Sequence, residues 1–218
     1  MPLHSPPLVR LLAALEAGEP GPARPQASVG ERLGQWLDWT DAIALSQTLN
    51  QVPPPPAEPV PAARAAQRAS TALARVREDC SRAILQDPVF QPEQRAAADL
   101  GDIRRAAQAR QRSMAAAIAP LRAQLRGLLA ARSAPLAHLA ALDATLEAAL
   151  SERERHSLSG VVARLERQFQ QLQQPGTDAW RDSFFQTMQQ LLLAELDLRL
   201  QPVQGLADAL GEALGEAA

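Results

Sequence analysis

The 218-residue sequence has little of what most catalytic and metal centres are built from. It contains one cysteine, no tyrosine and no lysine, and only 3% of its residues are aromatic. The single cysteine, Cys80, cannot form an internal disulfide, and it lies in helical phase with Leu73 and Val76. We therefore expect a small buried thiol rather than a nucleophile. The three histidines lack metal-ligand spacing, and neither a glycine-rich phosphate loop nor a serine elbow occurs.

Two carboxylates are the nearest approach to an acid–base pair. Asp38 and Asp41 share one face of a predicted helix, as paired carboxylates in acid–base chemistry often do. Without an obvious cleft, such residues are more often part of a solvated polar face. The sequence thus predicts no catalytic residue, no metal site and no cofactor, and a protein that is not an enzyme.

Long apolar runs are also absent. No run approaches the roughly 18 to 20 residues that are needed to cross a bilayer. The run from Leu8 to Leu15 is interrupted by Arg10 and lacks the pattern of a signal peptide. We expect no transmembrane segment and a cytoplasmic protein.

Hydrophobic residues nevertheless make up 46% of the chain, and many of them are alanine. Alanine favours helix but buries little area, so the predicted core is thin. Apolar positions recur at steps of three and four, and no useful stretch alternates with period two, as a strand would. The patterns predict an all-α protein, an elongated helical bundle with an antiparallel coiled-coil-like hairpin arm.

Composition divides the chain into four segments. Residues 1–50 are an N-terminal helical segment, and residues 51–61 are a proline-rich linker expected to adopt polyproline II structure. Residues 62–132 are an Arg/Ala-rich helical hairpin arm, and residues 133–218 are a C-terminal helical bundle segment. The alternative for residues 51–61 is a loop within one domain.

The arm is predicted from two helical patterns that a short connection joins. The patterns cover residues 63–86 and 93–132, and Pro120 should kink the second helix. The arm holds 13 arginines against 6 acidic residues, a net charge of +7, in a chain of net charge -2. Such charge most often belongs to solvated faces that complement acidic surfaces. The alternative is nucleic-acid binding, although the arm lacks aromatic residues for base stacking.

Two of the three tryptophans lie close together in the stretch RLGQWLDWTDAIALS, residues 32–46. On a helix predicted from Ser28 to Asn50, Trp36 and Trp39 share a face with Ile43. We expect this stripe to dock the N-terminal segment onto the rest of the protein.

The last long helix, predicted from Trp180 to Gln201, carries an apolar arc of about 220° that includes Trp180 and Phe184. Glu195 and Arg199 fall near the middle of this arc and are four residues apart, so they can pair along the helix. Because an unpaired buried charge costs several kcal/mol, we interpret the pair as a specificity device inside a core or subunit interface.

Two segments carry a family resemblance. RLGQWLDWTDAIALSQTLN (Arg32–Asn50) and LLLAELDLRLQPVQGLADAL (Leu191–Leu210) resemble an uncharacterised proteobacterial all-helical family, a domain of unknown function. The family has no established activity, so the resemblance implies no catalytic residue. It implies a role near envelope proteins of the flagellar-motor or outer-membrane-protein-A type, as an accessory to an envelope-associated assembly.

The leading hypothesis is a non-enzymatic, cytoplasmic interaction or scaffold protein whose helices bind a protein partner or a second copy. The alternative is a nucleic-acid-associated helical protein that uses the basic arm. The salt dependence of binding distinguishes the two hypotheses. Charge-driven binding to nucleic acid weakens steeply as the salt concentration rises, whereas apolar docking of helices does not. The candidate interaction residues are Trp36, Trp39, Trp180, Phe184, Glu195 and Arg199.

Overall fold

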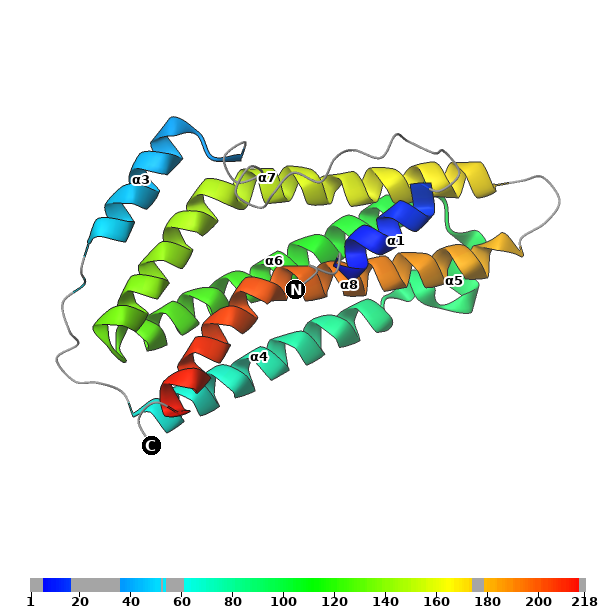
Figure 1. Cartoon of the computed structure of the whole chain (residues 1–218). Helices are drawn as coiled ribbons and strands as arrows, with labels where there is room; N and C mark the ends of the chain where they lie inside the picture. The colour runs from blue at the N-terminus through cyan, green and yellow to red at the C-terminus, as the bar shows by residue number, and fades with distance from the viewer. Residues whose placement is uncertain (1–5, 17–35, 52, 54–60, 174–178, 216–218) are drawn as a thin grey trace. The chain divides into compact units, whose positions relative to one another are not determined.

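The computed structural model describes residues 6–16, 36–51, 53, 61–173 and 179–215. All regular structure in these residues is helical and none of it is strand, which confirms the predicted all-α class (Figure 1). Among the described helices, none combines the length and the apolar character needed to cross a membrane. The elements are α1 (Pro7–Glu16), α3 (Trp39–Asn50), α4 (Ala62–Leu85), the 3-10 helix η1 (Pro88–Phe90), α5 (Pro92–Ala97), α6 (Leu100–Ala130), α7 (Ala134–Leu172) and α8 (Trp180–Gly215).

The chain forms two compact units whose boundary falls inside α4, α6, α7 and α8, not at the proline-rich segment. Each unit draws residues from both the arm and the C-terminal segment, so the four segments expected from composition do not coincide with the units. The physical reason is that each of these four long helices continues across the boundary and contributes residues to both units. Unit 1 comprises Met1–Gly21, Val76–Ile118 and Ser157–Leu200, and unit 2 comprises Pro22–Arg75, Ala119–His156 and Gln201–Ala218.

Unit 1 contains the aromatic part of the core. Phe169 of α7 makes edge-to-face contacts with Trp180 and Phe184 of α8, at centroid distances of 5.1 and 5.3 Å. Phe90 of η1 contacts Phe185 in the same way at 6.3 Å. The buried aliphatic residues around these rings come from α4, α6, α7 and α8 and include Ile84, Ile103, Met114, Leu165, Met188, Leu191, Leu192 and Leu196.

Unit 2 has the thinner core that an alanine-rich sequence predicts. Of its three buried α4 residues, Ala65, Ala69 and Leu73, two are alanines. Small side chains allow close approach of neighbouring helices but bury little area per residue. The other buried residues of unit 2 are mostly leucines of α6 and α8, namely Leu121, Leu125, Leu129, Leu206 and Leu210.

Two of the long helices differ from their predicted bounds. The single helix predicted over residues 93–132 is divided into α5 and α6 in the structure, because Ala98 adopts an extended conformation between them. A reciprocal cap then starts α6: the Asp102 N–H donates to Asp99 Oδ1 at 2.8 Å, and the Asp99 N–H donates to Asp102 Oδ2 at 3.0 Å. The two hydrogen bonds of this cap satisfy backbone donors that a continuous helix would have paired internally.

The helix predicted to end at Gln201 instead continues through Pro202 to Gly215 as α8. Proline forfeits one backbone hydrogen bond inside a helix. The side chains that follow it, Val203 and Leu206, are buried in unit 2, and their burial offsets that loss. Coiled-coil geometry in the arm stays a prediction, although α4 and α6 do touch in unit 1, where Arg110 Nη1 donates to the Ala83 carbonyl at 3.1 Å.

Candidate functional site

The tryptophan segment folds differently from its prediction. α3 begins at Trp39, because Asp38 is its N-cap and forms a capping box with Asp41. The Asp41 N–H donates to Asp38 Oδ1 at 2.8 Å, and the Asp38 N–H donates to Asp41 Oδ2 at 3.2 Å. The prediction of one helix through both Trp36 and Trp39 was therefore wrong, and its expected start at Ser28 lies outside the described residues. The two carboxylates serve as helix caps.

α3 contains no buried residue. The exposed fractions are 80% for Trp39, 42% for Ile43 and 54% for Leu49, and 45% for Trp36 just before the helix. The expectation that the tryptophan stripe docks on the protein was wrong for Trp39 and Ile43. We call Trp39, Ile43 and Leu49 the α3 apolar face; they lie within about 120° of one another around the helix.

The opposite face of α3 makes the contact with the rest of unit 2. Thr48 lies nine residues after Trp39, which is half a turn away around the helix axis. Its Oγ1 is 2.9 Å from Oγ1 of Thr145 on α7. Thr48 Oγ1 also lies 2.9 Å from the carbonyl of Ala44, one turn earlier. The α3 apolar face thus points away from the side of the helix that contacts the rest of unit 2, where Ala44, Leu45 and Thr48 are half-buried.

The Glu195–Arg199 pair forms as predicted, inside unit 1. Glu195 is 0% exposed, and Arg199 Nε and Nη2 lie 2.9 and 2.8 Å from its Oε1. The sequence reasoning missed a third member, Gln111 of α6, whose Nε2 donates to Glu195 Oε2 at 2.9 Å and to the Leu158 carbonyl at 3.0 Å. This amide links α6, α7 and α8 in one polar layer.

Gln111 could have been found from its spacing. It follows Ala107 by four residues and precedes Met114 by three, and both neighbours are fully buried. A glutamine in such an apolar seam has to find a hydrogen-bond partner, because a buried amide without one is costly.

Trp180 and Phe184 lie in the aromatic core of unit 1. Arg181 stacks over the Trp180 ring with its Cζ 5.0 Å from the ring centroid. Its Nη1 donates to the carbonyls of Arg95 and Ala98, at 3.0 and 3.1 Å, at the end of α5. Trp180 and Phe184 therefore serve in packing, and Arg181 caps the end of α5.

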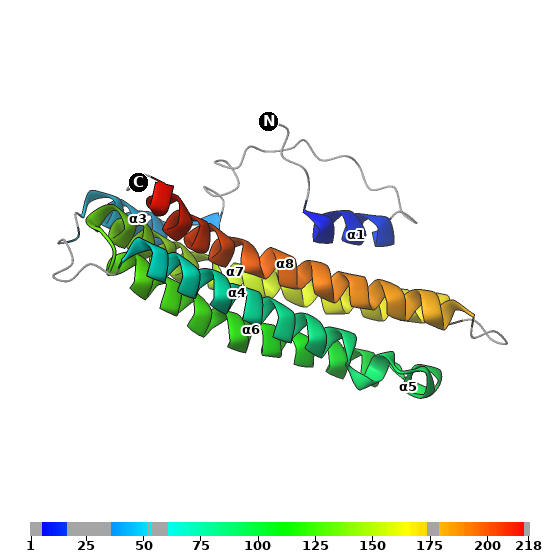
Figure 2. The ribbon, with the colours of Figure 1, turned by 90° about the horizontal axis from the view of Figure 1, so that it is seen from below.

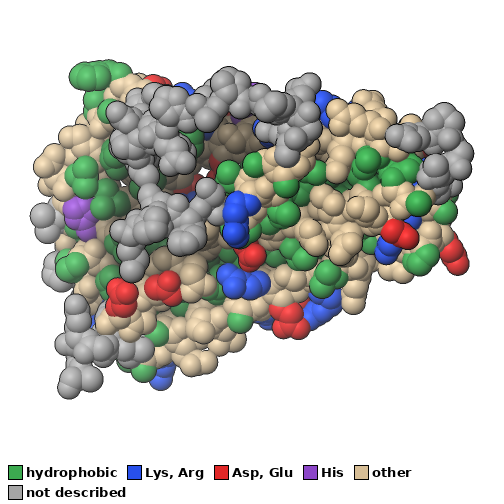
Figure 3. Space-filling view, turned by 45° about the vertical axis from the view of Figure 1, so that its right-hand side comes forward, with side chains coloured by type: hydrophobic (Ala, Val, Ile, Leu, Met, Phe, Trp, Pro, Cys, Tyr) green, Lys and Arg blue, Asp and Glu red, His purple; other side chains and the backbone are tan. Residues whose placement is uncertain are grey.

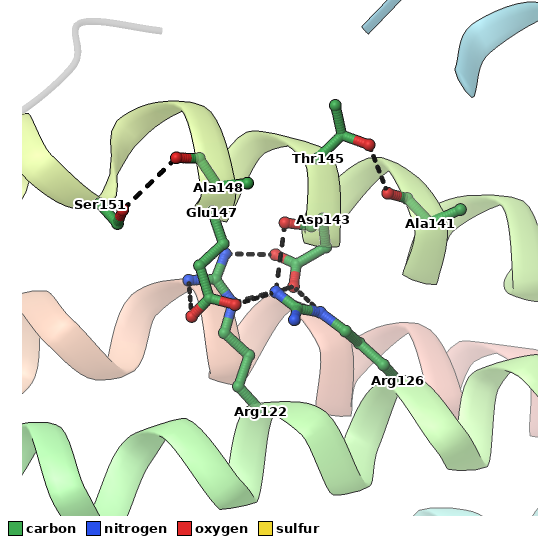
Figure 4. A network of polar contacts seen from close by, with 8 residues as sticks. All are labelled: Arg122, Arg126, Ala141, Asp143, Thr145, Glu147, Ala148 and Ser151. Carbon is green, nitrogen blue, oxygen red and sulfur yellow. Dashed lines mark hydrogen bonds and ion pairs between the residues drawn. The ribbon is translucent and has the colours of Figure 1, made fainter. Parts of the chain in front are cut away.

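A second polar cluster, not predicted from sequence, lies in unit 2 (Figure 4). Arg122 and Arg126 of α6 point at Asp143 and Glu147 of α7. Arg122 Nε and Nη2 donate to the two Asp143 oxygens at 2.8 and 2.6 Å, and Arg126 Nε donates to Asp143 Oδ2 at 2.7 Å. Arg126 Nη2 also donates to Glu147 Oε2 at 2.6 Å. Both arginines and Asp143 are largely buried.

The two arginines lower the pKa of Asp143. Burial on its own would raise this pKa, but the hydrogen bonds and positive charges of Arg122 and Arg126 together outweigh burial. The available sequence signal was a pair of arginines four residues apart on one helix and a pair of acids four residues apart on the next. Such i,i+4 spacing places each pair on one helix face.

Comparison with known families gives one match. The family model described as a protein of unknown function, DUF3348, matches residues 1–212. The chain belongs to the DUF3348 family. Curated proteins give no match, and solved structures give none either.

The DUF3348 match confirms the prediction that the chain belongs to a family of unknown function. It spans both the tryptophan segment and the LLLAELDLRLQPVQGLADAL segment, and it includes residues of both units. The family description states no activity, so the assignment of a function rests on the side chains.

In this DUF3348 chain, the described residues contain no group of three or more His, Cys, Asp or Glu that could hold a metal ion. Cys80 is buried in unit 1. Burial, together with the charge of Asp79, raises the pKa of the thiol. A thiol with a raised pKa is a poor nucleophile, which fits the packing role predicted for Cys80.

Proposed function

We propose that this protein is a non-enzymatic interaction protein whose α3 apolar face binds in a groove of a partner protein. One observation carries the proposal: α3 buries none of its residues, yet it holds Trp39 at 80% exposure. Tryptophan is enriched among the residues that dominate binding energy at protein interfaces. An exposed apolar face on a helix that is anchored from its other side is typical of a surface that another protein covers.

The length of α3 constrains the mode of binding. Twelve residues of helix are about 18 Å long, which is too short to supply the roughly 800 Å² per partner of a standard interface by flat contact. A groove that surrounds the helix face buries more of it. We infer the helix-in-groove mode, in which Trp39 and Ile43, one turn apart, are the anchoring side chains.

The setting of this function is proposed from the sequence and the family resemblance. The resemblance supports an accessory role beside an envelope-associated assembly. The lack of a catalytic constellation in the sequence supports a role other than catalysis, and a cytoplasmic site of action is part of the same proposal.

A paired substitution on α3 tests the proposed function. Trp39→Ser with Ile43→Ser should reduce capture of the partner from the native organism at least tenfold, because Trp anchors contribute about 2 kcal/mol or more. Quantitative mass spectrometry of pull-downs with the full chain measures the loss. The matched control is Leu85→Ser, which removes an isolated side chain of 50% exposure from the end of α4. Equal capture by the α3 variant and by the wild type would contradict the proposal.

A further inference from the structure

Two arginines at the start of α4 differ from most others in the described chain. Arg95, Arg104 and Arg122 each contact an acidic side chain, and Figure 3 shows basic and acidic groups side by side on one face. Arg64 and Arg68 are exposed, and no hydrogen bond or ion pair joins either of them to a described residue. No acidic residue occurs between Ala62 and Arg77 to neutralise them.

Two carboxylates near the end of α8 are the counterpart of these arginines. Asp208 and Glu212 are exposed, and no basic residue occurs from Gln201 to the end of the sequence. Asp208 Oδ1 accepts a hydrogen bond from Gln204 Nε2 at 2.8 Å, and no described arginine contacts either carboxylate. Both carboxylates belong to unit 2, as do the two arginines.

The two pairs match in geometry. Arg64 and Arg68 are four residues apart, and so are Asp208 and Glu212. Each pair therefore spans about 6 Å along its helix and about 40° around it. We call them the α4 basic stripe and the α8 acidic stripe. Figures 1 and 2 both place the start of α4 beside the end of α8.

We propose that unit 2 pairs with unit 2 of a second copy of this chain, with the α4 basic stripe of each copy facing the α8 acidic stripe of the other. A two-fold axis lets one surface that carries both stripes complement itself. This pairing uses different side chains from the α3 apolar face and does not depend on it.

A second copy suits these stripes better than nucleic acid does. A phosphate backbone held by the α4 basic stripe would lie beside the end of α8, which carries acidic residues and no basic residue after Gln201, so it would be repelled. The net charge of the whole chain, -2, also opposes attraction of a polyanion. Exposed ion pairs are individually weak and are screened by salt, so the proposed dimer is weak and salt-dependent.

Charge reversal tests the proposal on the full chain by sedimentation equilibrium. Raising the salt from about 50 to about 500 mM should raise the dissociation constant of the wild-type dimer at least tenfold. Arg64→Glu with Arg68→Glu, and separately Asp208→Arg with Glu212→Arg, should each remove self-association, because like charges then face each other. An equimolar mixture of these two variants should form a heterodimer, since every facing pair is again of opposite sign.

Two controls separate this pairing from general effects. Arg153→Glu with Arg155→Glu on α7 changes the net charge by the same amount as the α4 reversal, and it should dimerise like the wild type. The Trp39→Ser, Ile43→Ser variant should also dimerise like the wild type, which separates failure of this inference from failure of the proposed function. Circular dichroism checks that each variant remains helical.

Three results would overturn the proposal. They are a wild type that stays monomeric at about 1 mM in low salt, an α4 reversal that dimerises like the wild type, and a mixture of the two reversals that stays monomeric. Retardation of a duplex oligonucleotide by a monomeric wild type, lost in the α4 reversal, would assign the α4 basic stripe to a phosphate backbone instead.

Discussion

Replacing Glu195 with alanine should lower the free energy of unfolding by about 3 to 5 kcal/mol. The substitution removes the carboxylate whose Oε1 accepts from both Nε and Nη2 of Arg199, at a site where the guanidinium side chain is only 12% exposed. It also removes one acceptor of the Gln111 amide. Urea unfolding followed by circular dichroism measures the change. Asp197→Ala is the matched control, because Asp197 is exposed on the same helix and its loss should cost less than about 0.5 kcal/mol.

A double-mutant cycle separates burial of the pair from its attraction. Glu195→Met together with Arg199→Met should be much milder than either single change to methionine, since two apolar side chains avoid the desolvation cost of two charges. Gln111 keeps its bond to the Leu158 carbonyl in that variant. If both single changes shift stability by only a few tenths of a kcal/mol, the pair is solvated and the polar layer of unit 1 is wrongly described.

Replacing Asp143 with alanine should cost about 3 kcal/mol. Arg122 and Arg126 both direct hydrogen bonds at this carboxylate, and both are largely buried. Glu147 is more exposed and retains one contact with each arginine, so it compensates only in part. Glu152→Ala, at an exposed position on the same helix, is the control. A loss from Asp143→Ala no greater than that of the control would contradict the buried network.

The same carboxylate predicts a pH dependence. The pKa of Asp143 is lowered in the folded protein from its ordinary value of 3.8. Its ionised form therefore contributes stability that is present above pH 3.8 and is lost as the pH falls through the lower, folded-state pKa. The stability difference between the wild type and Asp143→Asn should be constant near neutral pH and shrink below about pH 4. A difference that grows on acidification would mean that the pKa is raised.

Sequence reasoning reached the helical fold and one polar pair because both depend on local spacing. Steps of three and four residues define the buried faces of long helices, and Glu195 and Arg199 are one turn apart on the same helix. Cys80 was placed by the same phase argument, and its burial confirms it.

The missed features depend on contacts between distant parts of the sequence or on competing local signals. Gln111 and Glu195 are 84 residues apart, and only the packing of α6 against α8 brings them together. The start of α3 was missed because two capping signals compete, one at Ser28 with Glu31 and one at Asp38 with Asp41, and propensity does not choose between them. Because α3 begins after the cap at Asp38, Trp36 lies outside this helix and Trp39 lies inside it. An uninterrupted helix would have contained both tryptophans.

The central claim is that the α3 apolar face is covered by a partner protein. Site-specific photo-crosslinking in living cells of the native organism tests it most directly, with the reactive side chain at position 43 of the full chain and, for comparison, at position 85. The account predicts a discrete crosslinked protein from position 43 that is absent from position 85 and is lost when Trp39 is changed to serine. Crosslinks that are the same at both positions, or none at position 43 in cells that contain the protein, would contradict it.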